Sequence, residues 1–204
     1  MIVFVETNFL LELVLQQEEL EHCQRIVRFA QSEKIDLVMP AYSLVEPYEA
    51  FHRRHAERRK LIAEVHQQTR QLRRSPNLSE SLSDAASVER IILDSQAQER
   101  AALDAVRHEL LRAATIISLG PEIVGNSIAI RSELEMSGQD SVVLASVLNY
   151  ARSVGMPPSV FLNRNKKDFQ DPTVLDLLGS VNCKLLTSFR AGCEYLEHTL
   201  VGEF

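Results

Sequence analysis

The chain opens with Met1-Ile-Val-Phe-Val-Glu-Thr-Asn8, and this stretch indicates the class of fold. Ile2 to Val5 is continuously apolar and rich in β-branched residues, and it stops at Glu6. A short run that is apolar on both faces is typical of a strand buried inside a parallel sheet. Parallel strands need long, usually helical connections, so an α/β fold is expected.

Helical and strand-like patterns alternate after this first strand. Further strands are expected over residues 35–39, 114–119, 160–162 and 183–187. Helices are expected over residues 8–16, 20–31, 121–135, 140–152 and 171–178. No element is predicted after Thr187. The alternation favours a parallel α/β sheet.

Two long helical stretches interrupt this alternation. They cover residues 43–74, as one helix or two, and 84–114, with a loop-like segment at 76–83. We expect a single domain, residues 1–204, with a helical insertion at 52–113 whose helices pair as an antiparallel hairpin. The insertion has more apolar residues than one hairpin needs, which predicts a homodimer through it. These residues include Leu61, Leu72, Val88, Ile91, Ile92 and Leu103.

Composition excludes several classes of protein. The 204 residues are 45% apolar and 25% charged, as in an average globular protein. The net charge of −6 argues against a generic polyanion binder, and three cysteines without CxxC spacing argue against a disulfide framework or a zinc knuckle. No basic leader and no apolar run of about 18 residues are present, so we expect a cytoplasmic protein without a membrane span.

Four carboxylates fall at the ends of predicted elements. Glu6 follows the first strand, Glu46 begins the helix after the second, Asp140 opens a buried helix, and Asp168 follows the fourth strand. Ligands of parallel sheets bind beyond the carboxyl ends of the strands, so these acids are expected in one cleft. They would repel one another unless a cation lay between them. Mg²⁺ or Mn²⁺, which prefer oxygen ligands, would be the natural occupant.

Each acid also has a structural explanation. Ser43-Leu-Val-Glu46 fits a capping box, and Asp140 in a first helical turn is favourable by the helix dipole alone. Asp168 fits a solvated loop acid, and Glu6 fits a residue that only satisfies hydrogen bonds at a strand end. The sequence leaves these alternatives open.

Four blocks of the sequence resemble, in the same order, those of PIN-domain nucleases. Position 6 is Glu where the family has Asp, and Asn163 stands where Thr or Ser is common. The resemblance covers residues 1–51 and 114–190 and leaves the insertion outside. The blocks are Val3-Phe-Val-Glu-Thr-Asn-Phe-Leu-Leu11, Pro40-Ala-Tyr-Ser-Leu-Val-Glu46, Ser137-Gly-Gln-Asp140 and Phe161-Leu-Asn-Arg-Asn-Lys-Lys-Asp-Phe169.

The resemblance implies a three-layer α/β/α sandwich with a central parallel sheet and a Mg²⁺- or Mn²⁺-dependent endoribonuclease. By the same resemblance, the catalytic metal ligands would be Glu6, Glu46, Asp140 and Asp168. Asn8 and Asn165 would support these ligands or position the substrate. The metal would polarise the phosphate and activate a water molecule.

Positive charge is concentrated in residues 52–74, which hold eight Lys or Arg against two Glu. This stretch carries +6, so with a total of −6 the remaining residues carry −12. The RNA-contact candidates are Arg53, Arg54, Arg58 and Arg59, although a solvated helix face would have the same composition.

Two other functions are compatible with the sequence. One is a catalytically weak PIN-like module that binds RNA or a protein partner through residues 52–113. The other is a toxin-type nuclease that an antitoxin-like protein holds silent.

Overall fold

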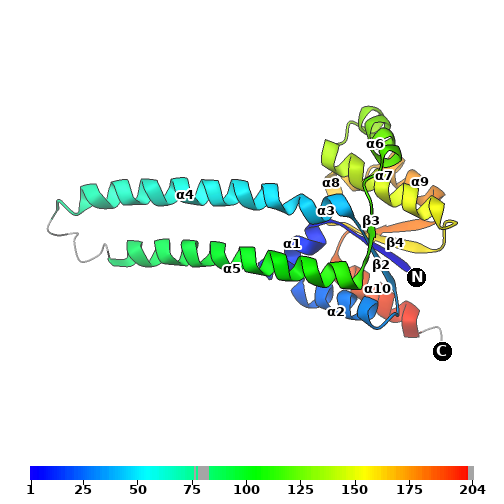
Figure 1. The fold of residues 1–204 in the computed structure, drawn as a ribbon, viewed down its shortest axis with the longest axis horizontal. Coiled ribbons are helices and arrows are strands. Elements are labelled where there is room, and N and C mark those ends of the chain that lie inside the picture. The colour runs from blue at the N-terminus through cyan, green and yellow to red at the C-terminus, as the bar shows by residue number, and fades with distance from the viewer. Residues whose placement is uncertain (76, 78–82, 202–204) are drawn as a thin grey trace. The chain divides into compact units, whose positions relative to one another are not determined.

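The structure is a computed structural model that describes residues 1–75, 77 and 83–201. The chain divides into two compact units, residues 1–46 with 106–204, and residues 47–105. The insertion predicted at 52–113 overlaps the second unit. The predicted loop at 76–83 lies outside the described residues except for Asn77 and Ser83. Figure 1 shows the elements of both units.

The first unit is built on a five-stranded, wholly parallel sheet with the strand order β3-β2-β1-β4-β5. The central strand β1 pairs on both sides, with Val3 opposite Leu37 and Val160. All five strands were predicted, and their bounds differ from the prediction by a few residues at most. The strands are β1 (Ile2–Val5), β2 (Asp36–Pro40), β3 (Thr115–Ile117), β4 (Ser159–Leu162) and β5 (Cys183–Leu186).

Helices cover both faces of this sheet, which gives the predicted three layers (Figure 1). One face carries α1 (Thr7–Leu15), α2 (Leu20–Gln31) and α10 (Phe189–Val201). The other carries α6 (Pro121–Leu134), α7 (Gly138–Ser153), α8 (Lys166–Phe169) and α9 (Pro172–Ser180). The rings of Phe9 and Phe189 meet edge to face at 5.3 Å on the first face, and those of Phe161 and Phe169 at 5.3 Å on the second. Side chains from both faces of the sheet are therefore buried, as the apolar strands predicted.

Two helices were missed by the sequence prediction. The short helix α8 contains Asp168, which was expected in a loop. The helix α10 presents Phe189, Cys193 and Leu196 to the core at spacings of three and four, a helical pattern that was present in the sequence. It packs so closely on β4 that a Cβ atom at Gly192 would lie 2.6 Å from Leu162.

The helical stretch after β2 is two helices, because it is interrupted before Pro47. Helix α3 (Ala41–Val45) ends there, and α4 (Pro47–Leu72) begins. Pro47 has no N–H to donate to the carbonyl of residue 43, so the helical hydrogen bonding cannot continue. The start of α3 at Ala41 also contradicts the proposed capping box, because Ser43 lies inside the helix and its buried hydroxyl has no hydrogen-bond partner among the described residues.

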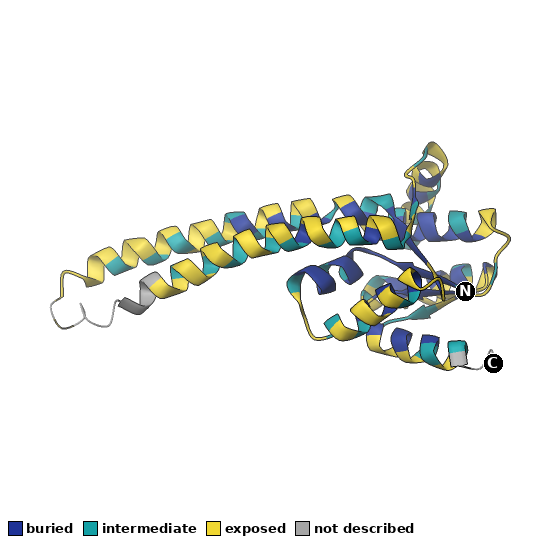
Figure 2. Ribbon diagram, turned by 60° about the horizontal axis from the view of Figure 1, so that its bottom comes forward, coloured by how far each residue is buried: buried dark blue, intermediate teal, exposed yellow. Residues whose placement is uncertain are grey.

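The second unit contains α4 and most of α5 (Ser83–Ala113), which pair as the predicted hairpin. We call residues 47–105 the hairpin. Its least exposed positions on α4 recur at spacings of three and four, as in a coiled coil. The positions that follow this spacing are Pro47, Phe51, His55, Arg58, Ile62, Val65 and Thr69, and Ala50, Arg54 and Ala56 beside them are also partly buried. Figure 2 shows both helices exposed over most of their remaining surface.

Polar pairs cross between the two helices of the hairpin. Arg58 donates to Glu99 at 2.9 Å and to Ser95 at 3.2 Å, and His55 lies 3.3 Å from the same Glu99 carboxylate. Nearer the far end, His66 and Glu89 are 2.6 Å apart. These pairs fix which residues of α4 face which residues of α5.

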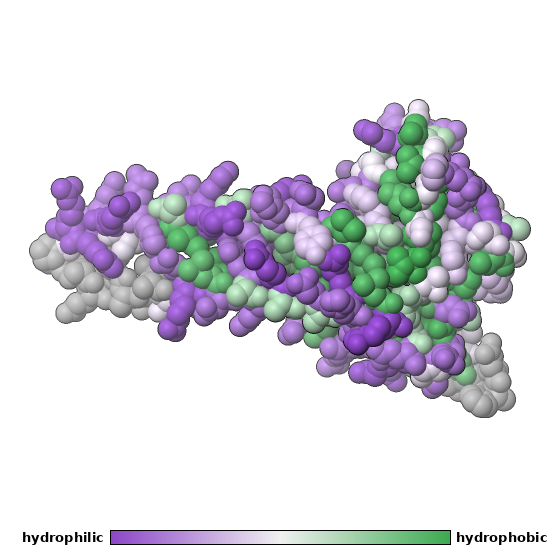
Figure 3. All heavy atoms as spheres, in the orientation of Figure 1, coloured by the Kyte–Doolittle hydropathy of each residue, from purple (hydrophilic) through white to green (hydrophobic). Residues whose placement is uncertain are grey.

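Apolar side chains remain exposed on the hairpin. Leu61, Leu72, Val88 and Ile91 are 43–66% exposed, whereas Leu103 is buried. Figure 3 shows hydrophobic side chains gathered between the two helices near the middle of the hairpin. The homodimer through this surface stays a prediction.

The three cysteines are free and buried. Among the described helices, none combines the length and the apolar character that a membrane span needs.

Candidate active site

Glu6 lies at the carboxyl end of β1, the central strand, and caps the N-terminus of α1. Its Oε2 accepts a hydrogen bond of 3.0 Å from the backbone N–H of Asn8. The residue is only 6% exposed, and its Oε1 is buried without a hydrogen-bond partner among the described residues. Burying a carboxylate oxygen without a hydrogen-bond partner costs free energy. Helix capping therefore accounts for Oε2 of Glu6 but not for Oε1.

Burial raises the pKa of Glu6 from 4.5 to about 8. The hydrogen bonds from the backbone and side chain of Asn8 oppose this shift in pKa, whereas the charges of Glu46 and Asp140 increase it. Glu46 and Asp140 therefore lie close enough to Glu6 to interact with it electrostatically, although they come from distant parts of the sequence.

Glu46 follows α3 and is oriented by Thr7, the first residue of α1. The Thr7 hydroxyl donates a short hydrogen bond to the Glu46 carboxylate. Tyr42, on α3, lies beside both Glu46 and Asp140. Burial raises the pKa of Tyr42, both acids raise it further, and a hydrogen bond from Gln139 lowers it. Helix α3 packs against both α1 and α7, which brings these side chains together.

Asp140 stands in the first turn of α7, where Ser137 is the N-cap. The backbone N–H of Asp140 donates to the Ser137 hydroxyl at 3.0 Å, and that hydroxyl donates to the Asp140 carboxylate at 2.7 Å. Burial raises the pKa of Asp140, the hydrogen bonds of Ser137 and Asn165 lower it, and the charge of Asp168 raises it. A serine followed by an acid three positions later was predicted to cap a helix at Ser43 and Glu46. The structure has this arrangement at Ser137 and Asp140 instead, where it caps α7.

Asn165 joins the last two acids. Its side-chain amide donates to Asp168 at 2.7 Å and to Asp140 at 3.3 Å. Its own backbone N–H donates to the buried Asn163 side chain at 2.7 Å, so Asn163 shapes the turn that follows β4. Asp168 is half-buried in α8 and held by Asn165, which contradicts the explanation of a solvated loop acid.

An ion pair holds the same turn from the other side. Arg164, between Asn163 and Asn165, donates to Glu12 of α1 at 2.5 Å, and Glu12 is only 1% exposed. The other Glu12 oxygen accepts from the backbone N–H of Glu19. The turn that carries Asn165 is therefore tied to α1 as well as to β4.

Electrostatic interactions and hydrogen bonds with shared neighbours therefore link the four predicted acids. Glu6 interacts with Glu46 and Asp140, Asp140 interacts with Asp168, and Asn8 and Asn165 donate to members of the set. Sequence reasoning missed Thr7 and Ser137, which orient two of the acids. Thr7 was visible as the residue after Glu6, and Ser137 as a serine three positions before an acid.

A family model described as a PIN domain matches residues 3–169. The chain belongs to the PIN-domain family. All four acids of the site lie within the matched range. A search of curated proteins gives no match to this chain. PIN domains are generally nucleases, so the chain has a nuclease-type fold.

PIN nucleases typically use divalent metal ions, and the donor atoms at this site suit them. Carboxylate oxygens are the ligands that Mg²⁺ and Mn²⁺ prefer, and the Glu6 Oε1 lacks any other partner among the described residues. The side chains are not preassembled, because no group of three or more His, Cys, Asp or Glu in the described part of the chain is arranged to hold a metal ion. Glu6, Glu46, Asp140 and Asp168 would have to draw together around the ion.

The four predicted RNA-contact arginines lie in different environments on α4. Arg58 is engaged by Glu99 and Ser95, and Arg54 stacks 5.7 Å from the centre of the Phe51 ring. Arg53 and Arg59 are exposed. Of the four, Arg53 and Arg59 are the most accessible to a ligand.

Proposed function

We propose that this PIN domain is a metal-dependent endoribonuclease that hydrolyses RNA phosphodiester bonds at Glu6, Glu46, Asp140 and Asp168. The observation that carries the proposal is the Glu6 carboxyl, which is buried and interacts with two other acids, and of which one oxygen has no hydrogen-bond partner within the described part of the chain. A protein without use for such a group gains stability by replacing it, so its presence points to chemistry.

The neighbouring residues of this chain orient the acids. Asn8 fixes Glu6, Thr7 fixes Glu46, and Ser137 fixes Asp140, each through a hydrogen bond to a carboxylate. The side-chain amide of Asn165 donates hydrogen bonds to both Asp140 and Asp168. A divalent metal ion bound here would polarise the scissile phosphate and lower the pKa of a water molecule.

A catalytically weak PIN-like module that binds RNA or a protein partner is the second candidate. Two observations favour it. Position 6 is Glu where the family has Asp, and both oxygens of Asp140 already accept hydrogen bonds from protein groups. A misplacement of about 1 Å in such a site costs on the order of 100-fold in rate.

A cleavage assay separates the two candidates. The full chain is incubated with a set of labelled RNAs in Mn²⁺, in Mg²⁺ and in excess EDTA, as wild type, Asp140→Asn and the control Asp176→Asn, an exposed acid of α9. The nuclease proposal expects cleavage that EDTA stops and that Asp140→Asn lowers at least about 100-fold, because a ligand charge is lost. Cleavage that survives EDTA, or that Asp140→Asn leaves at the level of Asp176→Asn, would contradict it.

A further inference from the structure

A cavity of about 470 Å³ lies within the hairpin, lined by residues of both α4 and α5. Its volume falls in the range of pockets that bind small molecules. None of the four acids of the active site lines it. The cavity therefore needs an explanation separate from the catalytic chemistry.

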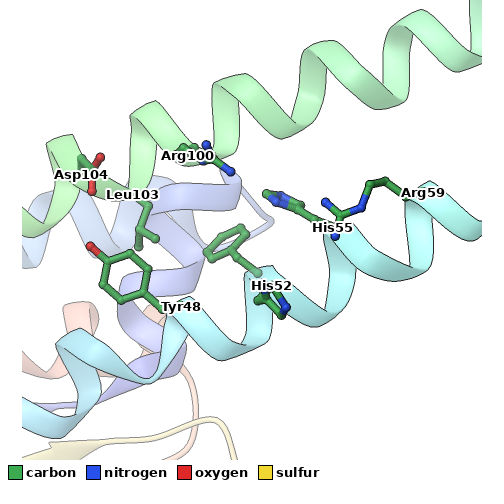
Figure 4. Close-up of a pocket in the computed structure, with 8 residues that line it drawn as sticks. Tyr48, His52, His55, Arg59, Arg100, Leu103 and Asp104 are labelled. Atoms are coloured by element: carbon green, nitrogen blue, oxygen red, sulfur yellow. The ribbon is translucent and has the colours of Figure 1, made fainter.

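One end of the cavity is aromatic and apolar. Phe51 and Leu103 are buried in its wall, and Tyr48 is 48% exposed. Figure 4 shows Tyr48 on α4 and Leu103 on α5 facing each other, with Asp104 beside the Tyr48 ring. An accessible aromatic ring beside an apolar wall is a surface on which a nucleobase stacks.

The other end of the cavity is cationic. Arg59 comes from α4 and Arg100 from α5, and Figure 4 shows both side chains directed toward His55. Both arginines are exposed, and neither forms an ion pair within the described residues. The neighbouring acid, Glu99, is already engaged by Arg58 and His55. Two guanidinium groups from opposite helices thus remain available to an anion, and guanidinium matches the geometry of phosphate.

We propose that this cavity binds one nucleotide of an RNA strand, with the base against Tyr48 and the phosphate on Arg59 and Arg100. Asp104 lies beside Tyr48, one helical turn from Arg100, and Figure 4 shows the Arg100 guanidinium directed away from it. The inference rests on the proposed function for its ligand, since RNA is the substrate of the active site. In this proposal Arg100 contacts RNA and Arg58, which was predicted to do so, does not. The sequence did not indicate Arg100, because it lies outside the basic stretch at residues 52–74.

Binding of a labelled twelve-nucleotide RNA to the full chain tests this site. Fluorescence anisotropy is measured in EDTA, with oligo-A and oligo-U, so that cleavage plays no part. Arg100→Gln is compared with Arg90→Gln, an exposed arginine of the same helix that does not line the cavity, and Arg59→Gln with Arg70→Gln, which meets the same conditions on α4. Tyr48→Leu tests the stacking wall. Circular dichroism spectra identify any variant that fails to fold, and the pairs on two helices keep the test independent of one substitution.

The cavity variants should weaken RNA binding about tenfold, as expected for a lost charged hydrogen bond or a lost stacking contact. Arg59→Gln and Arg100→Gln should also lower the slope of log K against log salt by about 0.7 each, the value for one phosphate of a single strand. The two control variants should change binding much less. Equal losses in Arg100→Gln and Arg90→Gln, or unchanged binding in Tyr48→Leu, would overturn the proposal.

The outcome is separable from that of the nuclease proposal. RNA binding that depends on the cavity without any cleavage would leave this site standing and refute the nuclease. Metal-dependent cleavage with equal RNA binding by all variants would refute this site and leave the nuclease standing.

Discussion

Glu6→Gln should stabilise the metal-free protein, and the gain should grow as the pH rises from 5 to 8. The pKa of Glu6 is about 8 in the folded protein and 4.5 as its ordinary value. Between these values the folded state keeps a proton that the unfolded state has lost, so raising the pH favours unfolding. Gln cannot ionise, and its amide oxygen still accepts from the Asn8 N–H at the N-cap.

The size of the effect follows from the shift in pKa. A difference of about 3.5 units corresponds to an upper limit of about 5 kcal/mol at pH 8, and relaxation around a charged Glu6 reduces it. We expect the stability difference between Glu6→Gln and wild type to grow by about 1 kcal/mol per pH unit in this range. Mn²⁺ should reduce the difference, because a cation favours the Glu6 carboxylate.

Urea denaturation in EDTA at pH 5, 6, 7 and 8 measures this difference. Glu18→Gln, which removes an exposed acid, is the matched control and should show no growing gain. A stability difference between Glu6→Gln and wild type that stays constant from pH 5 to pH 8 would refute the reasoning. Glu6 would then titrate as an ordinary solvated carboxyl, and its burial could not be a sign of a metal site.

Three further substitutions test the groups around the site. Asn165→Ala should lower RNA cleavage by about 10- to 100-fold, since it releases Asp140 and Asp168, and unchanged rates would show that the amide bridge is not used. Arg164→Met should lower the free energy of unfolding in urea by about 2 kcal/mol, because it leaves the Glu12 carboxylate buried without its cation; the loss is below that of a fully buried pair because Arg164 is 40% exposed. Glu6→Asp should preserve or raise cleavage, which should be faster in Mn²⁺ than in Mg²⁺ for the wild type; a large loss in Glu6→Asp would show that the longer side chain is required.

The sheet was predictable because each strand is a short apolar run between polar residues. A strand that is buried on both faces shows no alternation of polar and apolar residues. The strands were therefore predicted from the length of each apolar run and from the residues that flank it. The break before Pro47 was also readable, since proline cannot donate the next helical hydrogen bond. The missed helix α10 has an ordinary helical pattern, and only its position after the last strand left it unassigned.

The site was predictable in its acids and less so in their partners. Ligands bind beyond the carboxyl ends of parallel strands, and this rule predicts that Glu6 and Asp168, which follow β1 and β4, lie at one edge of the sheet. Glu46 and Asp140 belong to the ends of helices, so the rule does not place them by itself. The partners depend on which helix begins where. Because α3 begins at Ala41, Ser43 lies inside the helix and does not cap it, whereas Ser137 does cap α7.

The cavity of the hairpin was not predictable from the sequence. Its two arginines lie 41 positions apart, on helices whose relative register is set by Arg58, His55 and Glu99. A basic stretch in a sequence identifies charge but not which charges are already paired. Within the described residues Arg58 forms an ion pair and Arg59 forms none, although the two are neighbours in the chain.

The proposed nuclease activity requires that Glu6, Glu46, Asp140 and Asp168 together hold a metal ion. Anomalous diffraction at the manganese edge, from crystals of the full chain soaked in Mn²⁺, tests this most directly. We predict a manganese peak between these four carboxylates, with the Glu6 Oε1 among its ligands, and no such peak in Asp140→Asn crystals under the same soak. A saturating Mn²⁺ soak of the wild type that leaves this position without a peak, or that places manganese only elsewhere on the protein, would contradict the claim.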